Sequence, residues 1–318
     1  KNFLLKKIMR NRKLFHFILR QSYLAQQPLT QGDSMIRHLP NVLEQDHGYK
    51  NLPAIVKEPL RDRWENLSGR IEKPSLKVAF FAGCAIDFIY PEQGEDLLAL
   101  LNKADIQVDF PLDQTCCGLP AMMAAEEETV MQIANQNMSA FKAGDYDYIL
   151  TLCASCASHL KHNYEKVFNE SGRMKGKIKE EFENFSGKVV DFSSFMDNHY
   201  PFEETIKPKN IKVAYHSPCH LGRGLNVTKQ PRDLIKKAGY LYVPSRDEDV
   251  CCGFGGSYSV DFPEISAEIL NKKLDNIEAS EADILVTDCP GCVIQIKGGL
   301  DKRNSNVEVL HLAQLLAR

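Results

Sequence analysis

The sequence predicts an α/β protein made of two tandem, Rossmann-like modules with parallel sheets, preceded by a helical N-terminal segment. Two observations carry this prediction: ten cysteines fall into two sets of five with the same spacing, and short apolar runs alternate with helical stretches around them. Strands that alternate with helices are typical of a parallel sheet. We expect a helical basic lead and linker over residues 1–75, a first module over 76–205 and a second over 206–318.

The cysteine spacing defines the repeat. In each set a lone cysteine precedes an adjacent pair by 32 positions, and the pair precedes a Cys-x-x-Cys by 36 or 37 positions. The flanking residues repeat as well, because Lys-Val-Ala-Phe-Phe-Ala-Gly stands before the first lone cysteine and Lys-Val-Ala-Tyr-His-Ser-Pro before the second. The first set is Cys84, Cys116, Cys117, Cys153 and Cys156, and the second is Cys219, Cys251, Cys252, Cys289 and Cys292.

Apolar runs predict the strands, which in the first module cover 77–81, 106–110, 148–152 and 189–190 and in the second cover 212–215, 284–287 and 307–310. Leucines at helical spacing over 97–101 and an apolar stripe over 263–277 predict two of the helices between them. The carboxyl ends of parallel strands gather at one edge of a sheet. We therefore expect the five cysteines of each module to converge there and to form two separate metal centres.

Residues 1–73 contain no cysteine and belong to neither repeat. Seven basic residues and no acidic one precede Asp33, and six apolar residues form a stripe between them: Leu4, Leu5, Ile8, Phe15, Ile18 and Leu19. This pattern predicts a helix packed on its own protein or on a neighbouring module; docking to a membrane surface or a redox partner is the alternative. The prolines and charges over 52–64 predict a linker on the surface.

Composition excludes several classes of function. The formal net charge of −3 gives no global attraction to nucleic acid or anionic membranes, and no run approaches the roughly 18 apolar residues of a spanning helix. No signal-peptide pattern opens the chain, so we expect a cytoplasmic protein. A phosphate-binding Gly-x-x-x-x-Gly-Lys motif is absent, and the glycines after Cys252 do not fit a dinucleotide loop. Flavin and nucleotide are expected on a partner.

Three kinds of chemistry compete for the cysteines. Structural disulfides are disfavoured, because five thiols cannot pair within a module and the expected compartment is reducing. Zinc takes four ligands and would leave one thiol over, although zinc at one of the two sites remains open. An iron-sulfur cluster can use adjacent thiolates on different irons. Gly118 and Gly253 follow the cysteine pairs, where a backbone without Cβ could approach a cluster and direct its amides to sulfur.

The order Cys, Cys-Cys-Gly, Cys-x-x-Cys, occurring twice, resembles the cysteine-rich CCG domain pair of heterodisulfide reductase. The surrounding residues are still more similar to lactate-utilisation and glycolate-oxidase iron-sulfur subunits, in Phe81 to Glu92, Gln114 to Ala121, Ser217 to Gly224 and Cys251 to Val260. The resemblance implies that all ten cysteines bind metal, in two non-cubane [4Fe-4S] clusters, with Gly83, Gly118 and Gly253 at the cofactor.

The resemblance also implies a function: an oxidoreductase subunit that takes electrons from a flavin-dependent 2-hydroxy acid dehydrogenase and passes them to quinone or another carrier. Two alternatives stay open, a catalytic disulfide reductase like heterodisulfide reductase and a zinc-stabilised interaction scaffold. The ferredoxin-type Cys-x2-Cys-x2-Cys-x3-Cys-Pro run of longer relatives is absent from this sequence, so a partner subunit or a further module would supply it. Contact with the inner face of a membrane would come through such partners.

Histidines beside the lone cysteine of the second set are candidates for proton transfer. His220 directly follows Cys219, and we predict that it is catalytic; His216 could hydrogen-bond a thiolate and tune its potential. His159 is expected to be structural. The first module has Ala85 where the second has His220, so the second site is predicted to be the chemically active one.

Overall fold

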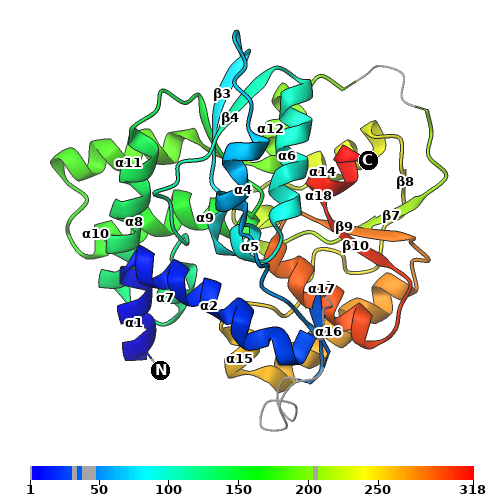
Figure 1. Cartoon of the computed structure of the whole chain (residues 1–318). Coiled ribbons are helices and arrows are strands. Elements are labelled where there is room, and N and C mark those ends of the chain that lie inside the picture. Colours follow the sequence, from blue (N-terminus) through cyan, green and yellow to red (C-terminus); the bar gives the residue numbers. More distant parts are fainter. Residues whose placement is uncertain (1, 31–33, 38–47, 203–206) are drawn as a thin grey trace.

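The computed structural model describes residues 2–30, 34–37, 48–202 and 207–318, and it contains two four-stranded parallel sheets (Figure 1). The first sheet has the order β4-β3-β5-β6 and the second the order β10-β9-β7-β8. When the four strands of each module are numbered 1 to 4 in chain order, both sheets have the order 2-1-3-4. This shared order confirms the predicted repeat. The first sheet consists of β3 (Leu76–Phe80), β4 (Ile106–Asp109), β5 (Tyr148–Thr151) and β6 (Val189–Asp191); the second consists of β7 (Lys212–Tyr215), β8 (Leu241–Tyr242), β9 (Ile284–Thr287) and β10 (Glu308–His311).

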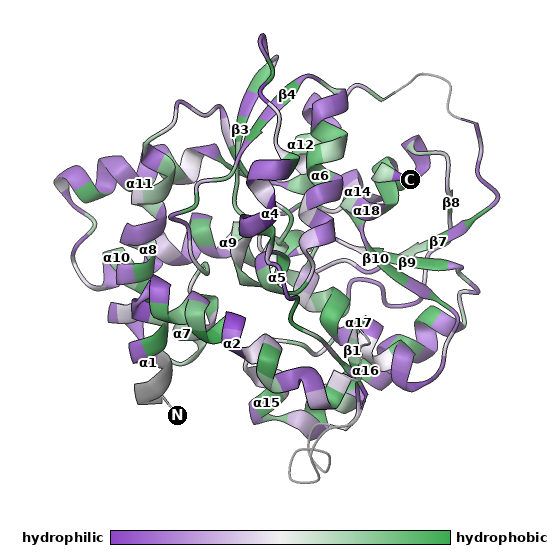
Figure 2. Cartoon of the chain, viewed as in Figure 1, coloured by the Kyte–Doolittle hydropathy of each residue, from purple (hydrophilic) through white to green (hydrophobic). Residues whose placement is uncertain are grey.

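Sequence patterns located every strand of the two four-stranded sheets except β8. That strand has two residues, of which Leu241 is 50% exposed, so no buried apolar run marks it. The central strands are buried on both sides: all four residues of β9 are buried, as are the last three of β3 and β7. Continuous burial of this kind is typical of parallel strands covered by helices on both faces. Figure 2 shows β9 and β10 mostly green, whereas purple positions are frequent on the outer helices.

Helices follow the strands as the alternation predicted. The first module contains α5 (Gly83–Phe88), α6 (Pro91–Lys103), α7 (Leu119–Met123), α8 (Glu127–Lys142), α9 (Ala154–Ser158), the π-helical turn η1 (His159–Asn163), α10 (Tyr164–Glu170), α11 (Gly176–Lys188) and α12 (Phe192–His199). The second contains α13 (Cys219–Gly222), α14 (Lys229–Lys237), α15 (Tyr258–Asp261), α16 (Pro263–Glu278), α17 (Pro290–Lys302) and α18 (Leu312–Ala317). No helix of the described residues is both long enough and apolar enough to cross a membrane.

The two modules exchange their last helices. Helix α12, which ends the first module, packs on α14 of the second, and α18, which ends the second module, packs on α6 of the first. Phe195, Leu234, Leu312 and Leu97 accordingly belong to one buried apolar cluster. Each fully buried side chain of this size contributes about 1.5–3 kcal/mol, so the modules stabilise each other. The predicted boundary at 205/206 lies outside the described residues.

The N-terminal lead packs on the first module. Helices α1 (Asn2–Arg10) and α2 (Arg12–Thr30) precede the repeats, and α1 contacts α7 and α8. Its basic side chains are bonded within the chain: Lys6 pairs with Glu126 at 2.9 Å, and Arg12 with Asp113 at 2.7 Å. Packing on its own protein, one of the two predicted arrangements, is therefore present. The structure does not describe the side chains of Leu4 and Leu5.

The predicted surface linker over 52–64 was wrong in its second half. This stretch contains β2 (Leu52–Pro53), which pairs with β1 (Met35–Ile36), and the start of α4 (Leu60–Leu67). Leu60 is fully buried, and the ring of Trp64 packs against Phe80 and Phe110 at centroid distances of 6.1 and 5.1 Å. Leu60 and Trp64 are one helical turn apart, so both face the core. The prolines and most of the charges that suggested a linker flank this helix or lie on its outer face, whereas Arg61 is buried in an ion pair with Asp87.

Candidate functional site

All ten cysteines lie just beyond the carboxyl ends of strands. Cys84 is in the first turn of α5, the first pair follows β4, and Cys153 is the N-cap residue of α9. In the second module Cys219 begins α13 and Cys289 is the N-cap residue of α17. None of the ten forms a disulfide; seven are buried, and Cys84, Cys219 and Cys251 are half-buried.

The thiols of the first set form a line. Neighbours along it lie within hydrogen-bonding reach, in the order Cys84, Cys116, Cys117, Cys156 and Cys153. A backbone amide also bonds to this set: the Cys156 N–H donates to the Cys153 sulfur at 3.4 Å. The first and last members of this order are Cys84 and Cys153, which are 69 positions apart in the sequence.

The second set forms an equivalent line, in the order Cys219, Cys251, Cys252, Cys292 and Cys289. The Cys252 and Cys292 sulfurs are 3.6 Å apart. The order matches the first set position by position, so the repeat extends from sequence to side-chain placement.

The two lines meet. Cys153 and Cys289 lie within hydrogen-bonding reach of each other, the Ala154 N–H donates to the Asp288 carbonyl at 3.0 Å, and the Ser155 hydroxyl is 3.5 Å from the Cys289 sulfur. The two predicted sets therefore lie next to each other at the boundary between the modules. The reason is the reciprocal packing of the modules, which turns the loops after β5 and β9 toward each other.

Three cysteines, one in the first set and two in the second, favour the thiolate form. Hydrogen bonds from Cys116 and Cys156 lower the pKa of Cys117 to about 5, and those from Cys219 and Cys252 lower the pKa of Cys251 to about 2. Hydrogen bonds from Cys153 and Cys292 likewise hold the pKa of Cys289 well below its ordinary value. Each thiolate accepts hydrogen bonds from the two thiols next to it. Those neighbours stay protonated, because two adjacent negative charges would repel each other. Thiolate is the form that binds metal.

The predicted glycines have left-handed backbones: φ is +65° at Gly83, +93° at Gly118 and +85° at Gly253. The Gly118 and Gly253 amides donate to the sulfurs of Cys116 and Cys251 at 3.5 and 3.3 Å. A Cβ on either residue would face a helix, at 3.2 Å from Ile133 or 2.8 Å from the Ser266 carbonyl oxygen, and not the thiols. Only at Gly83 would a Cβ crowd a sulfur, that of Cys156, at 3.3 Å.

His220 reaches across the module boundary. Its Nδ1 atom lies 3.1 Å from the Ser155 hydroxyl and 3.7 Å from the Cys219 sulfur, so it connects the lone cysteine of the second set to the Cys-x-x-Cys of the first. His159 is fully buried, its Nδ1 is 2.9 Å from the Asn163 amide, and burial lowers its pKa to about 3.

Neutral groups hold the first site. The buried Gln114 amide accepts from the Ala82 N–H and donates to the Phe80 carbonyl, both at 2.9 Å. Asn137 donates to the Cys116 carbonyl at 3.0 Å, and the Tyr164 hydroxyl donates to the Cys117 carbonyl at 2.7 Å. These bonds fix the loop of the first pair without adding charge.

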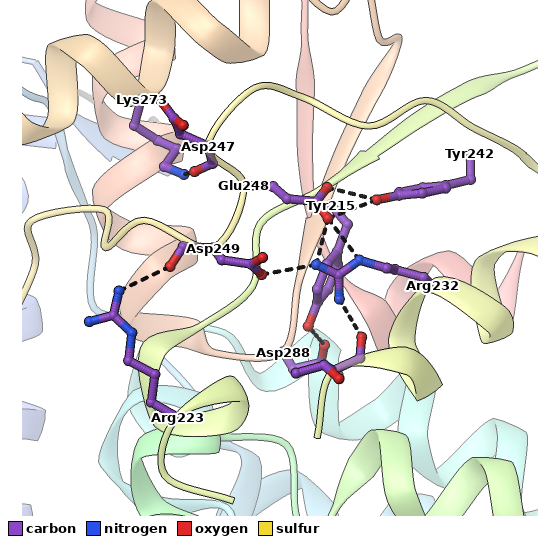
Figure 3. A network of polar contacts seen from close by, with 10 residues as sticks. Tyr215, Arg223, Arg232, Tyr242, Asp247, Glu248, Asp249, Lys273 and Asp288 are labelled. Carbon is purple, nitrogen blue, oxygen red and sulfur yellow. Dashed lines mark hydrogen bonds and ion pairs between the residues drawn. The ribbon is translucent and has the colours of Figure 1, made fainter. Parts of the chain in front are cut away.

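Charged groups hold the second site (Figure 3). Arg232 pairs with Glu248 at 2.5 Å and with Asp249 at 2.9 Å, just before the second cysteine pair. Tyr215 donates to the Asp288 carboxylate at 2.7 Å, beside Cys289. The network therefore positions both loops of the second set. Outside it, the Arg223 side chain donates to the Asp249 carbonyl at 3.5 Å.

Two buried lysines near Cys252 were not singled out from the sequence. Lys50 is 5% exposed, donates to the Gln295 side-chain oxygen and lies 5.2 Å from the centre of the Phe254 ring. Lys273 is 2% exposed and donates to the Asp247 carbonyl. Neither forms an ion pair with a carboxylate in the described part of the chain. Burial lowers the pKa of Lys50 to about 8, and Cys252 partly offsets this effect. No sequence signal reveals Lys50, which lies about 200 residues before Cys252.

Comparisons with known proteins agree with this geometry. The family described as Cysteine-rich domain (CCG) matches residues 78–161 and 213–297. Lactate utilization protein A 2 of Bacillus cereus (strain Q1) is 32% identical over 246 residues, covering 76% of this chain and 98% of that protein. A fumarate reductase (CoM/CoB) subunit of Methanothermobacter marburgensis is 32% identical over 247 residues, which cover 77% of this chain and 47% of that relative.

Among solved structures, a hypothetical protein from Helicobacter pylori has a similar fold. The TM-score is 0.53 at 12% sequence identity, and the match covers 96% of this chain and 57% of that one. At this identity the likeness concerns the fold alone.

Proposed function

The chain belongs to the cysteine-rich CCG family and carries two copies of its domain, and on this premise we propose that it is the iron-sulfur subunit of a multi-subunit oxidoreductase. In this proposal it accepts electrons from a flavin-dependent 2-hydroxy acid dehydrogenase, with lactate or glycolate as substrate, and passes them to quinone or another carrier. The name of the Bacillus cereus relative supports lactate utilisation, and the Methanothermobacter marburgensis relative, a reductase subunit, supports redox chemistry.

The observation that carries the proposal is the contiguous line of ten thiols. The donor set fits iron-sulfur clusters: it is all sulfur, mostly buried and free of disulfides, and three of its members favour the thiolate. The buried ammonium groups of Lys50 and Lys273 fit a negatively charged centre beside Cys252, because a buried charge without a partner is costly. Each set of five would hold one cluster.

When bound, the clusters supply one-electron acceptance and release. The chain's own residues do the rest. Burial of seven thiols excludes water, and the contact between Cys153 and Cys289 keeps the two sets together without an intervening side chain. The Gly118 and Gly253 amides donate to sulfur and stabilise negative charge there.

His220 is the residue that we propose for proton transfer. The residue is half-buried, and its Nδ1 faces Cys219 and Ser155. This placement favours a second candidate function, reduction of a disulfide substrate to two thiols, which consumes two electrons and two protons. Such a substrate would approach the second set at Cys219 and Cys251, which are half-buried residues.

The test is anaerobic purification followed by quantitation of iron, sulfide and zinc, with EPR spectra before and after reduction by a flavin-dependent lactate dehydrogenase. We expect iron and sulfide, two EPR signals after reduction, and loss of one signal in Cys252→Ser. A spectral change on adding a disulfide to the reduced protein would favour the disulfide reductase instead. A colourless protein that contains zinc without iron or sulfide would establish the scaffold alternative.

A further inference from the structure

His216 is a buried histidine without a hydrogen-bonding partner. It follows β7 and is 1% exposed, and neither ring nitrogen makes a hydrogen bond of ordinary geometry within the described residues. Leaving a buried polar group unpaired costs about 1–3 kcal/mol. Two unpaired nitrogens on one ring therefore indicate that the ring has a partner that is not a protein group.

The nearest polar atoms are sulfurs. A ring nitrogen of His216 and the sulfurs of Cys252 and Cys292 all lie within 4.8 Å of one another, and the two sulfurs are 3.6 Å apart. Around a tetrahedral metal with bonds of about 2.3 Å to sulfur and 2.0–2.1 Å to nitrogen, sulfurs are about 3.8 Å apart and sulfur and nitrogen about 3.5 Å. The three groups are thus close to the arrangement that one metal position requires.

We infer that His216 is a metal ligand of the second set and shares one metal position with Cys252 and Cys292. The inference rests on the proposed function in so far as the metal is an iron of a cluster. The same mixed thiolate and imidazole donors also suit zinc, and the experiment below separates the two.

The surroundings of the ring favour ligation. The ring is 1% exposed, and neither nitrogen has a hydrogen-bonding partner of ordinary geometry among the described residues, so a nitrogen lone pair is available to a metal. The Glu248 carbonyl lies near the ring on the loop drawn in Figure 3, and it already accepts the Ser217 N–H at 3.1 Å. Metal-bound histidines often donate their second N–H to such a carbonyl.

The first module has no counterpart, because Phe81 occupies the equivalent position and packs against Phe141 at a centroid distance of 5.7 Å. The two sets therefore differ by one ligand despite their matched thiols.

The test uses the intact chain, purified anaerobically after growth with ¹⁵N-histidine. Pulsed EPR of the reduced protein measures hyperfine coupling of histidine nitrogen to the iron spin, and X-ray absorption at the zinc edge measures nitrogen scattering at any zinc present. We expect a histidine nitrogen in the shell of one metal. Its loss in His216→Phe, which copies Phe81, would support the inference, and retention there would overturn it.

The matched control is His220→Gln, because His220 is the other histidine beside the second set and bonds Ser155 instead; its replacement should leave the nitrogen signal intact. If His216→Phe does not fold, the wild-type spectra decide: a protein whose iron and zinc both lack a histidine nitrogen overturns the inference. Iron present without nitrogen would leave the proposed function standing, whereas nitrogen at zinc without iron would support His216 as ligand and contradict the redox proposal.

Discussion

Cys153 of the first module and Cys289 of the second lie within hydrogen-bonding reach of each other, although 136 residues separate them in the chain. Each is the last member of its own line of five and the N-cap residue of a helix. The contact joins two copies of one motif, and His220 links Cys219 to Ser155 beside the same contact. A substitution at this contact should therefore change the spectroscopic signals of both sets.

Replacement of Cys289 tests this coupling. We expect Cys289→Ala to alter the EPR signals of both centres, because its thiolate accepts hydrogen bonds from Cys153 as well as from Cys292. The matched variant is Cys84→Ala at the opposite end of the first line, which contacts Cys116 and should alter one signal only. Spectra of Cys289→Ala in which the first centre is unchanged would show that the two sets act independently.

The ammonium group of Lys50 should raise the reduction potential of the second centre. A buried positive charge stabilises the more negative, reduced state, and the buried Lys50 ammonium lies 5.2 Å from the centre of the Phe254 ring, two residues after Cys252. We expect Lys50→Met to lower one of two midpoint potentials by tens of millivolts; about 59 mV corresponds to a tenfold change in a one-electron equilibrium.

Potentiometric titration followed by EPR measures this shift. Lys57→Met removes a charge from the exposed side of the same segment and serves as the control, because solvent screens that charge. Equal potentials in wild type and Lys50→Met would contradict a role for Lys50 as a counter-charge.

The glycines after the two cysteine pairs should differ in their tolerance of alanine. Both have φ near +90°, where an L-residue costs about 1–2 kcal/mol. At Gly253 the new Cβ would also lie 2.8 Å from the Ser266 carbonyl oxygen, whereas at Gly118 it would meet the Ile133 side chain at 3.2 Å, which can adjust. We expect Gly253→Ala to lower the unfolding temperature and the metal content more than Gly118→Ala. Equal losses would mean that backbone crowding by α16 is unimportant.

Acid should loosen the N-terminal lead through His16. This histidine of α2 is 8% exposed and packs against the Phe88 ring at a centroid distance of 5.3 Å. Burial, assisted by Arg61, Arg12 and Arg20, lowers its pKa from 6.5 to about 3. Between these values the unfolded chain binds a proton that the folded chain does not, so stability falls as the pH drops below 6.5, by up to about 1.4 kcal/mol per pH unit.

Thermal unfolding at pH 7.5, 6.5 and 5.5 checks this expectation. The wild-type protein should lose stability across the series, and His16→Leu should lose less, because a neutral side chain of similar size has no proton to bind. The comparison is between the two slopes, since other buried histidines contribute equally to both proteins. Equal slopes of stability against pH in the two proteins would exclude His16 as the source of the acid sensitivity.

Residue spacing by itself determined the repeat, the parallel α/β architecture, the position of most strands and the identity of the ten thiols. These features are local or periodic: a buried strand needs consecutive apolar residues, and a duplicated module repeats its intervals. The exceptions have the same origin. Strand β8 is too short to produce a pattern, and the charged residues of α4, among them the buried Arg61, concealed the burial of Leu60 and Trp64.

Tertiary structure alone decided how the two sets relate. The contact between Cys153 and Cys289 depends on the exchange of α12 and α18 between modules, and the burial of Lys50 beside the second set depends on how the lead folds back over α17. Both are contacts between residues more than a hundred positions apart, produced by packing of apolar surfaces whose partners no local interval specifies. The orphaned ring of His216 is likewise visible only when its surroundings are complete, because burial and missing hydrogen bonds are properties of the folded chain.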